Sequence, residues 1–360
     1  MKALIEKVIR PDVRAMSAYT VQAAQGFLKL DAMENPYAMP DHLRQELAKR
    51  LSQIALNRYP IPLYTELKEK ICREMGIPKG FNVVLGNGSD ELISIVSMAC
   101  ASKAKRAKML VPMPSFVMYE LSAQLNGMDY IGVDLKEDFT LDIDAMLAAI
   151  EKHQPTLVFL AMPHNPTGRL FEKSDILRIL DAMKDKGIVV SDEAYQPFTD
   201  FTMMPYLSKY SNLVVMRTVS KLGFAGIRLG YMSAAQELLT EFDKVRPPYN
   251  VNVLTEATAS LVMDNIDIFR AQAAAICAER TRLAAELSSL PGVDVIPSQA
   301  NIQLVRVKNA DAVFNGLLAR KILIKNVSKQ HPLLKECLRI TVSTPEENNQ
   351  FLTAFKDCLA

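Results

Sequence analysis

The segment Ile188-Val189-Val190-Ser191-Asp192-Glu193-Ala194-Tyr195 places a carboxylate directly after a short apolar run. A run of this length that is apolar throughout is typical of a strand buried on both faces of a sheet. Short apolar runs on either side of it alternate with stretches of helical periodicity, which is the pattern of strands joined by helical crossovers. The segment therefore predicts an α/β fold whose large sheet is mostly parallel and covered by helices.

The same alternation extends outward from this segment in both directions. The predicted strands cover residues 82–85, 107–111, 130–133, 156–161, 188–191, 213–217 and 228–232, and the predicted helices cover 90–101, 116–125, 143–153, 174–186 and 235–245. Ligands of such sheets bind at the carboxyl ends of the strands. Polar residues at those ends are therefore the candidates for function.

The two ends of the chain differ from this central part. Residues 1–40 are rich in loop-forming residues, and helical periodicity then covers 41–55 and 64–75. A long helical stretch at 255–290 is followed by strands at 302–307, 322–324 and 338–342 and by helices at 310–319 and 346–359. We therefore expect an N-terminal arm (1–40), a large domain (41–250) and a smaller α+β domain (251–360) that packs with the arm.

The composition predicts a cytoplasmic protein that acts on small molecules. The net charge of the 360 residues is only +2, so no overall field attracts nucleic acid or a membrane surface. The five cysteines and four histidines are scattered without metal-ligand spacing, and free thiols suit a reducing compartment. Charges interrupt the only early apolar run, so we expect no signal peptide, and no apolar stretch approaches the length of a membrane span.

The segment Leu85-Gly86-Asn87-Gly88-Ser89-Asp90-Glu91-Leu92 runs from a strand through glycines into a helix. Free backbone N–H groups at a helix start bind anions such as phosphate. A simpler reading makes Ser89 an N-cap, with Asp90 and Glu91 offsetting the helix dipole. If phosphate binds here, the backbone amides must hold it, because the carboxylates repel it.

Three further polar groups follow buried strands. Asn165 lies in the rigid turn Met162-Pro163-His164-Asn165-Pro166-Thr167-Gly168, which is either an ordinary loop or a group that enters a cleft. Asp192 needs a partner if buried, which could be an ion pair, a metal or a cationic cofactor. Lys221, with Arg228 beyond it, is either a surface lysine or a nucleophile made reactive by burial.

Together these groups match the needs of pyridoxal phosphate. Its phosphate requires backbone amides and an arginine, its aldehyde condenses with a lysine, and its ring nitrogen requires a carboxylate that keeps it protonated. Asn165-Pro166-Thr167-Gly168, Ser191-Asp192-Glu193-Ala194-Tyr195 and Ser220-Lys221 with Arg228 resemble the fold-type I, class II aminotransferases. Because segments such as Glu34-Asn35-Pro36-Tyr37 extend the likeness along the chain, the resemblance implies the branch that exchanges an amino group between histidinol phosphate and 2-oxoglutarate in histidine biosynthesis.

The resemblance also implies a role for individual residues. Lys221 would carry the cofactor, Asp192 would pair with its ring nitrogen, and Tyr195 and Asn165 would donate to its ring hydroxyl oxygen. The rest of the implied cofactor set is Ser89 and Asp90 through their amides, Ser220 and Arg228 at the phosphate, and Phe116 stacked on the ring. Tyr59 resembles a residue that reaches the cofactor phosphate of a neighbouring subunit, which implies a homodimer with shared sites.

On the substrate side, Arg339 resembles the arginine that binds the phosphate of one substrate and a carboxylate of the other. A planar guanidinium suits both anions, because each is held by paired hydrogen bonds. Tyr19 and Asn35 are further substrate candidates. Lys325 stands where relatives often have a second arginine, so it keeps the charge but loses the forked geometry.

Three alternatives stay open on the sequence alone. The first two are an aromatic amino-acid aminotransferase and a threonine-phosphate decarboxylase of the same fold. The third is a regulatory protein that binds the cofactor without catalysis, although that class adds a DNA-binding domain for which residues before 41 leave no room.

Overall fold

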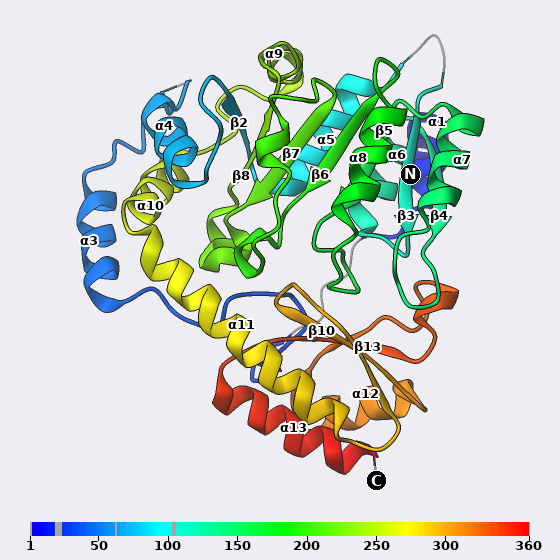
Figure 1. Ribbon diagram of the computed structural model, residues 1–360. Coiled ribbons are helices and arrows are strands. Elements are labelled where there is room, and N and C mark those ends of the chain that lie inside the picture. The colour runs from blue at the N-terminus through cyan, green and yellow to red at the C-terminus, as the bar shows by residue number, and fades with distance from the viewer. Residues whose placement is uncertain (1, 19–23, 62, 103–105, 360) are drawn as a thin grey trace.

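The computed structural model describes residues 2–18, 24–61, 63–102 and 106–359. Figure 1 shows a large sheet flanked by helices, with a smaller sheet and the red C-terminal helix below it. The long yellow helix α11 runs from the large sheet's side of the molecule to the smaller sheet. None of the helices within the described ranges has the length and apolar character needed to cross a membrane.

The large sheet has seven strands in the order β2-β8-β7-β6-β5-β3-β4. Its strands are β2 (Asn82–Gly86), β3 (Lys108–Met113), β4 (Asp129–Asp134), β5 (Leu157–Ala161), β6 (Ile188–Asp192), β7 (Leu213–Thr218) and β8 (Gly230–Ala234). Neighbours from β4 through β7 pair in parallel, and only β8 runs antiparallel to its neighbours β2 and β7. The prediction of a mostly parallel sheet is confirmed.

Helices cover both faces of this sheet because successive side chains of each strand point to opposite sides. Val190 and Val214 pack with α5 (Ser89–Cys100), α6 (Val117–Leu125) and α9 (Gln236–Val245). Val189 and Val215 pack on the other face with α7 (Ile143–His153) and α8 (Lys173–Ala182). Further along that second face lie α3 (Asp41–Ser52), α4 (Thr65–Glu74) and α10 (Val253–Asp264).

The smaller sheet has four antiparallel strands in the order β12-β13-β10-β9. Its strands are β9 (Val293–Ile296), β10 (Ile302–Val307), β12 (Lys325–Asn326) and β13 (Cys337–Thr341), and it packs with α11 (Ile266–Ser288), α12 (Ala310–Ala319) and α13 (Pro345–Leu359). The N-terminal segment contains α1 (Lys2–Val8), α2 (Pro11–Ala15) and β1 (Leu28–Lys29). Strand β1 pairs in parallel with β11 (Ile322–Leu323) and so fastens this segment to the C-terminal part of the chain.

Most predicted boundaries agree within two or three residues, and four details of the prediction differ from the structure. The single helix expected over 255–290 is two helices, because Asn265 leaves helical geometry and its side chain caps the Leu261 carbonyl instead. The strand expected over 322–324 is β11, which ends at Leu323 and pairs with β1, whereas the smaller sheet takes its edge strand β12 from the next residues, Lys325–Asn326. Arg228 lies outside β8, because its φ of 52° is left-handed, and α8 ends at Ala182 rather than at residue 186.

Candidate active site

The carboxyl ends of β5, β6 and β7 border a cavity of about 150 Å³, which we call the front cavity. The start of α5 and the start of α6 close it from the side. Most residues that the sequence singled out line this cavity: Ser89, Asp90, Phe116, Asn165, Asp192, Tyr195, Ser220, Lys221 and Arg228. Segments far apart in the chain therefore meet at one edge of the sheet.

Asp192 ends β6 and is buried against the sheet. Its Oδ1 accepts the Ala194 N–H at 3.1 Å, and its Oδ2 accepts the hydroxyl of Tyr119 at 2.6 Å. Burial raises the pKa of Asp192 to about 6, although both of these hydrogen bonds act in the opposite direction. A carboxylate with this environment is prepared to receive a cationic partner.

Lys221 follows β7 in the tight turn Ser220–Phe224, which Gly223 permits with a φ of 127°. Its Nζ donates to the Ala32 carbonyl at 3.2 Å and lies 5.7 Å from the centre of the Tyr195 ring. Burial, and then the positive charge of Arg339, lowers the pKa of Lys221 to about 8. About a tenth of the amine is therefore neutral, and nucleophilic, at pH 7, far more than for an ordinary lysine.

The start of α5 packs closely against Arg228. Gly88 is the residue before the helix, with a φ of 81°, and a Cβ built on it would lie 2.5 Å from the Arg228 guanidinium. Arg228 also donates to Asp90 at 3.0 Å and to the Ser220 hydroxyl at 3.5 Å. The interpretation of Ser89 as an N-cap was wrong, because Ser89 is the first helical residue and leaves its N–H available.

Asn165 connects the front cavity to the smaller sheet. Its Nδ2 donates to the Tyr195 hydroxyl at 3.1 Å, and its Oδ1 accepts from Arg339 at 2.7 Å. A second cavity of about 330 Å³, which we call the outer cavity, shares Asn165 and Phe116 with the front cavity. Lys325 and Arg339 line it from directly opposed positions on β12 and β13, so two cations face the same space.

Two of the predicted residues that the structure describes, Tyr59 and Asn35, do not line either cavity. Tyr59 is 79% exposed and stacks on Tyr249 with ring centres 4.6 Å apart. Asn35 donates to the Leu222 carbonyl at 3.0 Å and so supports the Lys221 turn from behind. Its place on the substrate side stays a prediction. Tyr19 lies outside the residues that the structure describes.

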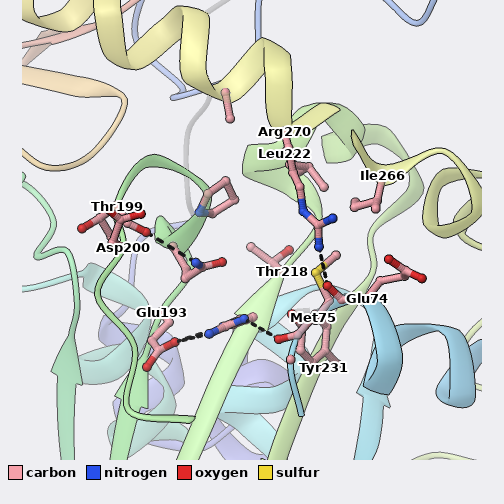
Figure 2. Close-up of a pocket in the computed structure, with 15 residues that line it drawn as sticks. Glu74, Met75, Glu193, Thr199, Asp200, Thr218, Leu222, Tyr231, Ile266 and Arg270 are labelled. Atoms are coloured by element: carbon pink, nitrogen blue, oxygen red, sulfur yellow. Dashed lines mark hydrogen bonds and ion pairs between the residues drawn. The ribbon is translucent and has the colours of Figure 1, made fainter. Parts of the chain in front are cut away.

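A third cavity of about 370 Å³, which we call the rear cavity, lies between the end of the sheet and the start of α11 (Figure 2). Glu193 and Arg217 border it and form an ion pair at 2.8 Å that is almost completely buried. Arg217 also donates to the Met75 carbonyl at 3.1 Å. Figure 2 marks both contacts by dashed lines that end on the labelled Glu193 and Met75. Because Glu193 directly follows Asp192, this pair fixes the chain behind the front cavity.

Sequence reasoning missed Tyr119, Thr218 and Met33, which also line the front cavity. The spacing of Tyr119 from Phe116 places both on neighbouring faces of the first turns of α6, so helical periodicity could have found it. Thr218 ends β7, and its hydroxyl accepts the Ser220 N–H at 3.1 Å. Met33 carries no pattern that marks it as a site residue.

Comparison with known proteins defines the class. The model of the family "Aminotransferase class I and II" matches residues 25–355, and the chain belongs to this family. A curated relative, histidinol-phosphate aminotransferase 1 of Burkholderia lata, is 56% identical over 351 residues, covering 98% of each chain.

Solved structures are similar in fold. The histidinol-phosphate aminotransferase of Sinorhizobium meliloti, in complex with pyridoxal-5'-phosphate, has a TM-score of 0.85 at 20% identity, over 98% of this chain and 97% of that one. L-threonine-O-3-phosphate decarboxylase of Porphyromonas gingivalis has a TM-score of 0.79 at 22% identity, over 92% and 99%. Because both activities occur on this fold, the fold alone does not separate them.

Class I and II aminotransferases use pyridoxal phosphate, and the residues of the front cavity fit this group. The amine of Lys221 suits an aldehyde, and the buried carboxylate of Asp192 suits a protonated ring nitrogen. The free N–H groups at the start of α5, approached closely by Arg228, suit a phosphate.

Proposed function

We propose that this chain catalyses pyridoxal-phosphate-dependent transfer of an amino group between histidinol phosphate and 2-oxoglutarate, a step of histidine biosynthesis. The observation that carries the proposal is the pair of adjoining cavities. The front cavity holds a lysine with a lowered pKa beside a buried carboxylate. The outer cavity presents two cations to an anionic substrate. The name of the 56% identical relative supports the same substrate.

Each residue of the front cavity then has a defined task. We assign the cofactor-binding set as Lys221, Asp192, Tyr195, Asn165, Phe116, Ser89, Asp90, Ser220 and Arg228. When bound, the cofactor provides an electron sink for the bond that breaks at the substrate Cα. Lys221 Nζ moves the proton from and to that carbon as a general acid–base, which its lowered pKa favours. Asn165 couples this chemistry to the substrate through Arg339.

The outer cavity selects for anions. Arg339 is buried and oriented by the Asp31 carbonyl at 2.8 Å as well as by Asn165. Its planar guanidinium can bind a phosphate or a carboxylate by paired hydrogen bonds. Lys325, at the paired position on the neighbouring strand, adds a second positive charge. This arrangement explains how one site can accept a phosphate ester in one half-reaction and a dicarboxylate in the other.

Replacing Arg339 with lysine is expected to reduce kcat/KM for both substrates by about 10- to 100-fold. The charge remains, but the paired hydrogen bonds and the contact with Asn165 are lost. Steady-state kinetics with each substrate measures the effect, and Arg320→Lys on the surface is the matched control. Equal kcat/KM values for Arg339→Lys and for this control would contradict the assignment of Arg339 to the substrate site.

A half-reaction screen tests the proposed function. The cofactor-loaded protein is mixed separately with histidinol phosphate, phenylalanine and threonine phosphate, and the loss of the cofactor's visible absorbance is followed. Histidinol phosphate should react fastest and release no carbon dioxide. Faster reaction with phenylalanine would favour the aromatic aminotransferase, and carbon dioxide from threonine phosphate would favour the decarboxylase.

We also propose that the protein is a homodimer with shared sites. Exposed apolar side chains gather around Tyr59, including Leu56, Ile61, Leu63 and Tyr249. Such a patch on a protein surface is typical of an interface. Tyr59 does not line the front cavity of its own chain, which agrees with a role in a neighbouring one.

Complementation tests the shared site. Mixing Tyr59→Ala and Lys221→Ala subunits, after unfolding and refolding together, creates one intact site in each mixed dimer. Activity should rise from near zero to about one quarter of the wild-type value if Tyr59→Ala alone is inactive. Light scattering checks the assembly state, and no recovery in a confirmed dimer would contradict the shared site.

We also propose a domain division and a cellular location for the chain. We divide the chain into an arm (1–40), a large domain (41–250) and a small domain (251–360), a division that the separation of the seven-stranded sheet from the four-stranded sheet supports. All five cysteines are free thiols, which supports a cytoplasmic location.

A further inference from the structure

Tyr119 is held rigidly at the base of the front cavity. Its side chain is buried, and its ring stacks on Phe159 with centres 4.7 Å apart and meets the edge of Phe116 at 5.7 Å. Aromatic neighbours in these arrangements leave the ring no free rotation out of its place. The position of its hydroxyl is therefore fixed by packing rather than by solvent.

That hydroxyl donates to Asp192 Oδ2 at 2.6 Å. Within the described ranges, no lysine or arginine forms an ion pair with Asp192. In the described part of the chain, its other hydrogen-bond donor is the Ala194 N–H, which bonds to Oδ1. Tyr119 is thus the side chain that stabilises the charge of this buried carboxylate before any ligand arrives.

We infer that Tyr119 is a positioning residue, whose hydrogen bond keeps Asp192 ionised and turned toward the ring nitrogen of the cofactor. The effect on the cofactor rests on the proposed function, whereas the hydrogen bond between Tyr119 and Asp192 does not. A carboxylate that already accepts a phenol is less basic, so the shared proton stays on the ring nitrogen. A protonated ring is the better electron sink, so the reaction at the substrate Cα accelerates.

Tyr119 cannot itself be the acid or base of the reaction. Burial, followed by the nearby charge of Asp192, raises the pKa of Tyr119 well above its ordinary value. The phenol therefore stays neutral and remains a donor. The other ionisable groups that line this cavity with Tyr119 and Asp192 are Asp90, Tyr195, Lys221 and Arg228, and the charge of Glu193 acts on Asp192 from behind. All of them are unchanged by a substitution at Tyr119.

The test is the titration of Asp192 in the full chain freed of cofactor. The infrared band of the protonated carboxylic acid is followed against pH and assigned by its loss in Asp192→Asn. In Tyr119→Phe the midpoint should move up by about one pH unit, because a hydrogen bond to a charged group commonly favours it by about tenfold. The control is Tyr64→Phe, which removes an equally buried hydroxyl, bonded to the Val251 carbonyl, away from Asp192.

With ¹⁵N-labelled cofactor bound, the ring-nitrogen signal of Tyr119→Phe should move toward the unprotonated value, and kcat should fall about tenfold with KM nearly unchanged. A folded Tyr119→Phe protein whose Asp192 midpoint equals that of Tyr64→Phe would overturn the inference.

A second variant, expected to shift the Asp192 midpoint in the opposite direction, keeps the test decisive if Tyr119→Phe does not fold. Replacing Tyr119 with 3-fluorotyrosine makes the phenol a stronger donor, so the Asp192 midpoint should fall below the wild-type value. An unchanged or higher midpoint would overturn the inference. Because the titration needs neither cofactor nor substrate, its outcome is separate from that of the half-reaction screen.

Discussion

Replacing Lys221 with alanine is expected to lower kcat by at least about 10⁴-fold, since the change removes both the nucleophile and the general base. The amine is buried, is directed by the Ala32 carbonyl, and has a pKa of about 8. Alanine supplies neither a covalent attachment nor a proton carrier. Steady-state kinetics measures the loss, and gel filtration of the purified protein shows whether cofactor is retained.

The control for this change is Lys68→Ala. Lys68 is another lysine whose pKa is lowered by burial, but it lies on α4 and does not line the front cavity. Its removal should leave kcat within a few-fold of wild type. Cofactor capture by the wild-type apo-protein should also accelerate as pH rises through about 8, because the neutral amine becomes the main form. A Lys221→Ala protein with more than a tenth of wild-type kcat would refute the assignment.

The sequence predicted the sheet and its functional edge because both depend on local patterns. An apolar run followed by a polar group marks the end of a buried strand, as at Asp192 and in the segment before Lys221. Parallel strands then bring these ends to one edge without further information. The front cavity contains most of the residues found in this way.

Contacts between distant segments could not be predicted in the same way. The bond from Tyr119 to Asp192 depends on how α6 packs on the sheet, which no local pattern specifies. Asn35 was assigned to the substrate side from its motif, which gives no sign of the hydrogen bond from its amide to the Leu222 carbonyl. Arg228 was expected in a strand, but its left-handed backbone turns it toward α5 instead.

Two carboxylates that are neighbours in the sequence have different roles in the structure. Glu193 lies beside Asp192 in the sequence, yet it points to the rear cavity and accepts hydrogen bonds from Arg217, Thr202 and the Met203 N–H. Successive residues at a strand end face opposite sides of a sheet. One carboxylate therefore faces the front cavity while its neighbour anchors the chain that holds it.

Replacing Arg217 with methionine is expected to destabilise the protein by about 3–5 kcal/mol, because it leaves the charge of Glu193 buried without its cation. The side chains of this pair are 6% and 0% exposed, so water cannot replace the lost partner. The midpoint of urea unfolding of the cofactor-free protein measures the change. The double variant Glu193→Gln with Arg217→Met should be much less destabilised, because glutamine carries no charge but still accepts the Met203 N–H.

The exposed pair of Arg178 and Asp144, 3.3 Å apart, provides the comparison. Arg178→Met should cost less than about 1 kcal/mol, because water already solvates both charges. Equal effects of Arg178→Met and Arg217→Met would mean that the buried pair contributes no more than a surface one. If instead Arg217→Met is destabilised as expected and also binds cofactor more weakly, the anchor behind Asp192 acts on the front cavity through the single peptide bond that joins Asp192 to Glu193.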